Sequence, residues 1–196
     1  MTRQWRWIAA SAAAALVVIG VAFALSSGAF RAEPPPAVGG PFRLTDTSGA
    51  RVDEGVLKGK WSLVFFGFTY CPEACPTTLA ALGKAMADLG PKAKDVQVVF
   101  ISVDPERDTP AALKAYLASP AFPKGTIGLT GSKADVAQVA KAYHVFYQKT
   151  GAGPDYSVDH STMIYVMDPK GRFRKLIPYG VTPDEVRRQL EDARRG

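Results

Sequence analysis

Two cysteines and one histidine of this chain have types and spacing that could support metal or redox chemistry. Cys71 and Cys75 are separated by three residues in the segment GFTYCPEACP, and such a loop can bring two sulfur atoms within disulfide or shared-metal distance. His160 follows in the segment VDHS. Two thiolates and an imidazole are a ligand set that Cu(I) prefers, and three ligands satisfy it. A stabilising disulfide is the simplest alternative, but closing so small a loop constrains the unfolded chain little.

The two prolines near the cysteines predict how the backbone presents the sulfur atoms. Pro76 suits the first turn of a helix, so Cys75 is predicted to cap a helix over residues 76–89. A thiol at a helix N-terminus is expected to have a lowered pKa, because the helix end stabilises the thiolate. Pro72 biases Cys71 toward extended backbone, so the intervening turn must fold the two sulfur atoms together.

The elements that must position these residues alternate between strand and helix patterns. Ser62 to Phe68 and Val96 to Val103 are apolar runs typical of strands buried on both faces. With the helix between them they form one right-handed parallel unit. The other predicted elements are a hairpin over 42–52, helices beginning at Thr109-Pro110, Ser132 and the capping box Thr182 to Glu185, and strands 162–167 and 173–177 joined by a turn at 168–171. This order predicts an α/β, thioredoxin-like fold, with a central mixed sheet flanked by helices.

His160 stands just before the predicted strand 162–167. In the predicted topology that strand runs antiparallel to strand 62–68, so its start lies beside the end of the other strand, next to Cys71. Asp159 could orient the imidazole through a hydrogen bond, although a solvated turn residue is the simpler interpretation.

Taken together, three ordered motifs resemble the SCO/SenC family of copper-binding assembly proteins. They are GFTYCPEACP, VDPERDTP (Val103 to Pro110) and VDHS (Val158 to Ser161). The resemblance covers roughly Pro41 to Leu190, and its one departure is Glu73, where the family commonly has aspartate. It implies a thioredoxin-like fold that holds one copper per chain through Cys71, Cys75 and His160.

The resemblance also implies a function and partners. The family delivers copper to the binuclear copper site of cytochrome c oxidase, or reduces the thiols of that site. A copper metallochaperone is therefore our first hypothesis, and its expected partners are the copper-bearing oxidase subunit, a copper donor and a thiol reductant.

A thiol-disulfide oxidoreductase is the alternative from another class. In that case Cys71 would attack a partner disulfide and Cys75 would resolve the mixed intermediate. Redox thioredoxins use Cys-x2-Cys and have proline where this chain has His160, and both differences favour metal. A peroxidase is a weaker third hypothesis, because neither cysteine lies in the Thr-x-x-Cys setting of such enzymes. Structural zinc usually needs a fourth protein ligand, for which the sequence offers no candidate.

The other residues that attract notice have simpler interpretations. The segment 104–110 is expected to form a loop and a helix cap, with a partner contact or a second metal site as the lesser alternative. His144 stands late in a predicted helix, where it would favour the terminal dipole. Met163 and Met167 share one face of a strand and are expected in the core.

The first thirty residues, 1–30, are predicted to be a targeting segment. Residues 7–25 are nearly all apolar, and their number approaches the roughly 20 needed to span a bilayer. Arg3 and Arg6 precede them, which orients the N-terminus toward the cytoplasm and exports the rest. An uncleaved transmembrane anchor is favoured by the length of the segment. The alternative is a cleaved signal peptide, with small residues at Ser27 and Ala29 before the cut.

Composition and charge limit the remaining possibilities. Apolar residues make up 47% of the chain and charged residues 21%, which excludes a disordered or collagen-like protein. The net charge of +6 is spread thinly, so nucleic-acid binding is not expected.

The Pro- and Gly-rich residues 31–40 are typical of a stiff linker that leads into a domain over 41–196. That domain would face the exported side of a membrane, most simply the periplasmic side of a bacterial inner membrane. Two free thiols need an explanation in such an oxidising compartment.

Overall fold

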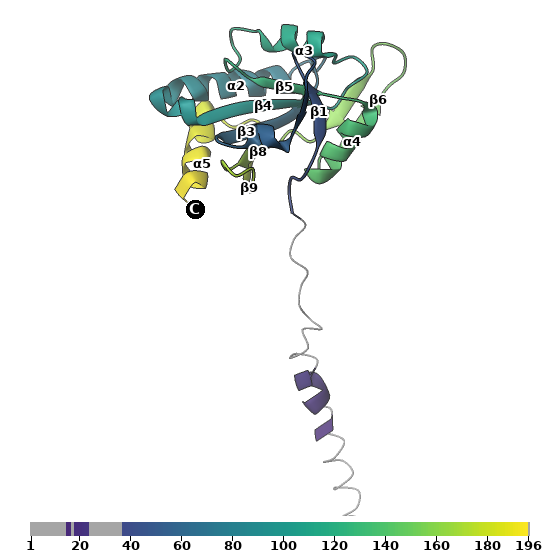
Figure 1. Cartoon of the computed structure of the whole chain (residues 1–196), viewed down its shortest axis with the longest axis vertical. Helices are drawn as coiled ribbons and strands as arrows, with labels where there is room; N and C mark the ends of the chain where they lie inside the picture. Colours follow the sequence, from purple (N-terminus) through teal and green to yellow (C-terminus); the bar gives the residue numbers. More distant parts are fainter. Residues whose placement is uncertain (1–14, 17, 24–36, 196) are drawn as a thin grey trace, which may run out of the picture. The chain divides into compact units, whose positions relative to one another are not determined.

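The computed structural model describes residues 15–16, 18–23 and 37–195, and Figure 1 shows the chain. The chain divides into two units, residues 1–36 and 37–196. In the first unit the described residues are helical. Most of the predicted targeting segment 1–30 and of the linker 31–40 lies outside the described residues. Within the part of the chain that the structure describes, we find no helix long and apolar enough to cross a membrane.

Across residues 37–195 the strands form a seven-stranded mixed sheet and a separate two-stranded sheet. The large sheet has the order β2-β1-β5-β4-β3-β8-β9, and the small one pairs β6 with β7. The strands are β1 (Arg43–Asp46), β2 (Arg51–Asp53), β3 (Trp61–Gly67), β4 (Val96–Ser102), β5 (Ile127–Thr130), β6 (Tyr147–Thr150), β7 (Ser157–His160), β8 (Ile164–Met167) and β9 (Phe173–Ile177). Strand β3 is central, because it pairs parallel with β4 on one side and antiparallel with β8 on the other.

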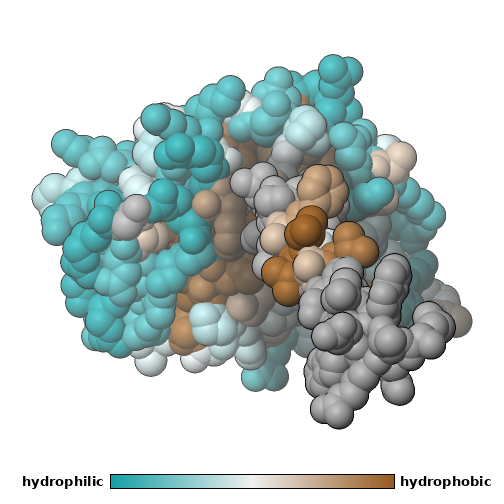
Figure 2. Space-filling model, turned by 90° about the horizontal axis from the view of Figure 1, so that it is seen from below, coloured by the Kyte–Doolittle hydropathy of each residue, from teal (hydrophilic) through white to brown (hydrophobic). Residues whose placement is uncertain are grey.

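Helices lie on both sides of the large sheet. They are α2 (Ala74–Asp88), α3 (Pro110–Leu117), α4 (Lys133–Ala142) and α5 (Pro183–Arg195), with 3-10 turns η1 (Glu54–Leu57) and η2 (Gly90–Asp95). Helices α2 and α3 lie on one side of the sheet and α4 on the other (Figure 1). Seen from below, the surface over α5 is largely hydrophilic (Figure 2).

The core has two layers because successive residues of β3 point to opposite faces of the sheet. The ring of Phe65 lies 6.0 Å from that of Phe100, on the side of α2 and α3. The ring of Phe66 lies 5.3 Å from that of Tyr143, at the end of α4. All four side chains are buried. Burial on both faces explains why β3 is a continuous apolar run in the sequence.

The observed fold agrees with the predicted α/β, thioredoxin-like arrangement of a central mixed sheet and flanking helices. Thr109 caps α3 as predicted, and its hydroxyl accepts a hydrogen bond from the backbone N–H of Ala112. Ser132 opens α4 with a complete capping box. Only half of the capping box predicted at α5 forms, because the carboxylate of Glu185 accepts from the side chains of Arg188 and Gln189 instead.

Two parts of the architecture were absent from the sequence-based prediction. Strand β5 forms next to β4, and the β6–β7 hairpin forms immediately before β8. His160 is therefore the last residue of a strand in a small separate sheet. The prediction for Cys75 was also wrong, because α2 begins at Ala74 with Glu73 as its cap, so Cys75 lies inside the first turn.

Candidate metal centre

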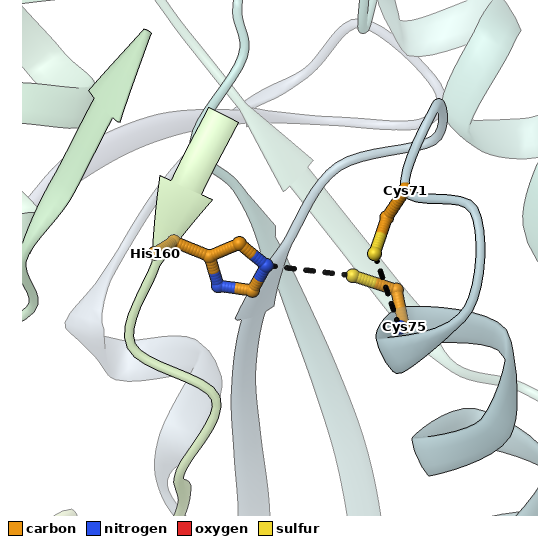
Figure 3. A group of neighbouring side chains, drawn as sticks. All are labelled: Cys71, Cys75 and His160. Atoms are coloured by element: carbon orange, nitrogen blue, oxygen red, sulfur yellow. Dashed lines mark hydrogen bonds between the residues drawn. The ribbon is translucent and has the colours of Figure 1, made fainter. Parts of the chain in front are cut away.

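Three side chains from three segments meet at the end of β3 (Figure 3). Cys71 lies in the loop that follows β3, Cys75 in the first turn of α2, and His160 at the end of β7. Their sulfur and nitrogen ligand atoms all lie within 4.8 Å of one another. The Sγ atom of Cys75 is 3.7 Å from Nε2 of His160. The structure thus brings together the three residues that the topology argument placed near each other.

The buried carboxylate of Asp108 holds the loop that carries Cys71 through hydrogen bonds to Thr69. Asp108 is fully buried and accepts hydrogen bonds from the backbone N–H of Thr69, at 3.1 Å, and from its hydroxyl, at 2.6 Å. The hydroxyl of Ser102, the last residue of β4, donates to the same carboxylate at 2.6 Å. Burial raises the pKa of Asp108, while the Ser102 and Thr69 hydrogen bonds oppose the rise. Asp108 therefore ties the cysteine loop to the end of the neighbouring strand.

The Cys75 side chain can lie against β3 because the strand ends in glycine. A Cβ atom at Gly67 would stand 2.7 Å from Sγ of Cys75 and 2.9 Å from the ring of Phe100. Real structures essentially never contain such short contacts, so a side chain here would displace the thiol. Gly67 thus provides the space in which α2 approaches the sheet and buries Cys75.

The two thiols differ sharply in exposure and in proton affinity. Cys71 is half-buried, and the hydrogen bond from the Cys75 thiol lowers the pKa of Cys71 to about 4. The pKa of Cys75 is raised, because this fully buried thiol holds its proton toward the sulfur of Cys71. The backbone N–H of Cys75 also donates to Sγ of Cys71, at 3.2 Å. The expectation of a lowered pKa at Cys75 was therefore wrong, and the thiolate belongs to Cys71.

The imidazole of His160 is oriented by the backbone and by two aromatic rings. Its Nδ1 lies 2.9 Å from the carbonyl oxygen of Ser161, and an Nδ1–H donated there leaves the Nε2 lone pair toward the thiols. The rings of Phe68 and Phe65 contact the imidazole edge-on, at centroid distances of 5.7 and 6.4 Å. Asp159 lies in β7 rather than in the predicted turn, and its exposed carboxylate accepts from the hydroxyl of Thr150.

This donor set fits a soft metal ion in three-coordinate geometry. With zinc-like bonds of about 2.3 Å to sulfur and about 2.0 Å to nitrogen, a trigonal site separates sulfur from nitrogen by about 3.7 Å. The separation between Sγ of Cys75 and Nε2 of His160 is 3.7 Å. Within residues 15–16, 18–23 and 37–195, no fourth ligand, whether a histidine, a cysteine or a carboxylate, joins these three residues. Two sulfurs and one nitrogen match the preference of Cu(I), whereas a structural zinc site needs a fourth ligand.

The remaining residues noted in the sequence lie elsewhere or support the site indirectly. His144 is exposed, follows the end of α4 and has a φ of 54°, in the left-handed region. Met167 is buried and Met163 is partly buried against the core, as expected. Sequence reasoning assigned no supporting role to Thr69, Asp108 or Arg107, although two of them belong to the VDPERDTP motif that it had singled out.

Comparison with known proteins gives a consistent result. A family model described as SCO1/SenC matches residues 31–194. Protein SCO1 homolog 1, mitochondrial, from Arabidopsis thaliana is 45% identical over 150 residues, which are 76% of this chain and 44% of that protein. The chain thus spans less than half the length of this curated relative.

Solved structures of similar proteins share both the fold and much of the sequence. ScoI from Bradyrhizobium japonicum, solved with copper bound, is 43% identical with a TM-score of 0.73, over 80% of this chain and 99% of that one. BsSco is described as a member of the Sco family of cytochrome c oxidase assembly proteins and as carrying a disulfide switch. It is 29% identical with a TM-score of 0.63, over 83% of this chain and 96% of that one.

Proposed function

Because the chain belongs to the SCO1/SenC family, we propose that it binds one copper ion as cargo through Cys71, Cys75 and His160 and passes it to another protein. The observation that carries the proposal is the convergence of three donor atoms within 4.8 Å, with no fourth ligand among the described residues. Copper-bound structures of similar Sco proteins support the choice of metal.

The chemistry of loading follows from the protonation states of the donors. Cys71 offers a thiolate, whereas the buried Cys75 keeps its proton beside it. Binding of copper to both sulfurs therefore releases the Cys75 proton, as metal binding to thiols requires. An Nδ1–H donated to the Ser161 carbonyl leaves Nε2 of His160 as the nitrogen that can bind the metal.

We propose the copper-bearing subunit of cytochrome c oxidase as the recipient, with a copper donor and a thiol reductant as further partners. The role in cytochrome c oxidase assembly attributed to the Sco family in the description of BsSco supports this destination. We further propose that residues 1–30 hold the domain at the exported face of a membrane, because their apolar length and the preceding arginines favour an anchor.

Anaerobic titration of the reduced full chain with Cu(I) tests the proposal. We expect one copper per chain, and loss of tight binding in Cys71→Ser and in Cys75→Ser. His160→Ala should retain Cu(I) weakly through the two thiolates and lose most affinity for the harder Cu(II). The matched control is His144→Asn at the chain's other histidine, because asparagine tolerates the left-handed backbone found there. Unchanged stoichiometry in both cysteine variants would falsify the proposal.

A thiol-disulfide oxidoreductase is the second candidate, and the asymmetry of the cysteines favours it. A half-exposed thiolate beside a buried, protonated thiol is the arrangement of an attacking and a resolving cysteine. Thiol exchange needs thiolate and access but no imidazole ligand. If exchange is the main activity, His160→Ala should reduce an oxidised Cys-x3-Cys peptide at nearly the wild-type rate. In cells, cytochrome oxidase assembly should then survive His160→Ala, whereas the copper proposal predicts that assembly fails.

A further inference from the structure

The imidazole of His160 and the two thiols belong to different parts of the fold. His160 ends the β6–β7 hairpin, which forms a two-stranded sheet of its own within residues 37–195. Both cysteines follow β3 of the large sheet. A cavity of about 180 Å³ lies between the hairpin and the segment 103–106. The cavity leaves the hairpin incompletely packed against this segment, so polar contacts supplement the apolar packing of Tyr156 and Val158 in holding the imidazole beside the thiols.

Arg107 supplies those contacts from the VDPERDTP segment. Its guanidinium carbon lies 3.6 Å from the ring centroid of Tyr156, in the hairpin connection, and 4.5 Å from that of Tyr70, next to Cys71. Nη1 donates to the backbone carbonyl of Tyr156 at 2.9 Å. Nε donates to the carboxylate of Asp104 at 2.5 Å, and the Tyr156 hydroxyl donates to the same carboxylate at 2.6 Å. Only 13% of the Arg107 side chain is exposed, so these charged contacts are poorly screened.

We propose that Arg107 is a positioning residue, which fixes the β6–β7 hairpin so that His160 faces the two thiols. The inference rests on the proposed copper function, because it concerns the geometry of that site. Asp108, the next residue, holds Thr69 of the cysteine loop. One short segment thus ties the dithiol and the histidine to a common support.

The outer contacts of the hairpin cannot substitute for Arg107. Lys149 pairs with Glu106 at 2.9 Å, but half of the lysine side chain is exposed, and such surface pairs contribute little. Lys133 pairs with the same Glu106 from α4, with 75% of its side chain exposed. Lys133 therefore provides a matched control, since it is a cation bound to the same segment from outside the hairpin.

The first test uses the reduced, metal-free full chain and therefore does not depend on copper. Arg107→Met removes the guanidinium and keeps an unbranched side chain. Amide hydrogen exchange of β7 should accelerate about ten- to hundredfold, because an unsupported two-stranded hairpin is marginal in water. Exchange in β3 and β8 should stay at the wild-type rate, and Lys133→Met should change neither region. Wild-type exchange of β7 in Arg107→Met would overturn the inference.

The second test asks whether Arg107 acts on the metal through His160, using Cu(II) alone as the probe. Arg107→Met should weaken Cu(II) binding at least tenfold in the wild-type background and less than twofold when combined with His160→Ala. Equal weakening in both backgrounds would show a general structural effect and would overturn the inference. Arg107→Lys serves if Arg107→Met does not fold. Lysine cannot make the forked contacts of arginine, so it should show the same pattern at smaller amplitude.

The two tests separate the inference from the function on which it rests. If the wild-type chain binds no copper but β7 exchange responds to Arg107→Met, the proposed function fails and the positioning role of Arg107 stands. If copper binds and β7 exchange does not respond, the function stands and the role of Arg107 is refuted.

Discussion

Gly67→Ala adds one methyl group at the end of β3, directly beside the thiol of Cys75. The new Cβ would stand 2.7 Å from Sγ, and ordinary contacts begin at 3.4 Å, so the sulfur must retreat by about 0.7 Å. Metal sites tolerate deviations of only about 0.2 Å in ligand distance. We therefore expect copper affinity to fall about tenfold or more, because one of the three donors no longer reaches its position.

The same substitution also lowers stability, since the methyl group overlaps the ring of Phe100 as well. Overpacking of this kind costs about 1–3 kcal/mol, which corresponds to a fall in Tm of about 3–9 °C for a domain of this size. Thermal unfolding of the reduced, metal-free protein measures this change. Anaerobic competition against a Cu(I) chelator measures the change in affinity.

Gly83→Ala separates the two effects. A Cβ at Gly83 in α2 would overlap the backbone carbonyl oxygen of Ala121, and Gly83 is not one of the three donor residues. This variant should lose comparable stability and keep the wild-type copper affinity. Wild-type copper affinity in a destabilised Gly67→Ala protein would refute the reasoning that places Cys75 among the ligands.

Three further predictions concern the redox state, the cysteine loop and the pH dependence of stability. Air oxidation should join Cys71 to Cys75 and leave a protein that binds copper poorly, because copper requires thiolates. Free thiols in the mass spectrum after oxidation, or equal copper uptake with and without reductant, would contradict this. Asp108→Ala should lower the free energy of unfolding, measured in urea, by about 3 kcal/mol or more, because it removes the acceptor of two hydroxyls and one backbone N–H. A loss below about 1 kcal/mol would exclude the role of Asp108 in holding the cysteine loop. The hydrogen bond from Arg51 lowers the pKa of Asp135 to about 2, so its contribution is full above about pH 4 and is lost as the pH falls toward 2. Asp135→Asn should therefore be less stable than wild type at pH 7, and the difference should shrink toward pH 2 in urea unfolding curves.

The sequence predicted the central part of the fold because its signals there are local and strong. The run at β3 is buried on both faces, and the helix pattern that follows it is amphipathic, so neither depends on distant partners. Strand β5 was missed because its four residues include Gly128 and follow no alternation. The β6–β7 hairpin was missed because most of its residues are exposed and polar, so its position depends on tertiary contacts, among them the buried side chain of Val158 and the hydrogen bond from Arg107 to Tyr156.

The protonation of the dithiol could not be predicted from the helix position of Cys75. The argument from the helix N-terminus treats each thiol alone, whereas two sulfurs in contact share their protons as a pair. Burial of Cys75 and partial exposure of Cys71 decide which sulfur keeps the proton. The burial of Cys75 depends on Gly67, which lets α2 approach β3, and therefore on a tertiary contact rather than on local sequence.

The uneven burial of the donors also bears on how copper would leave. Ligand exchange requires an incoming donor to reach the metal before an old one departs, and a fully buried ligand offers no such approach. Cys75 is fully buried, whereas Cys71 is half-exposed and lies beside Tyr70, whose side chain is largely exposed. An acceptor thiol should therefore enter on the side of Cys71 and displace that sulfur first, with Cys75 and His160 holding the copper until the second bond to the acceptor forms.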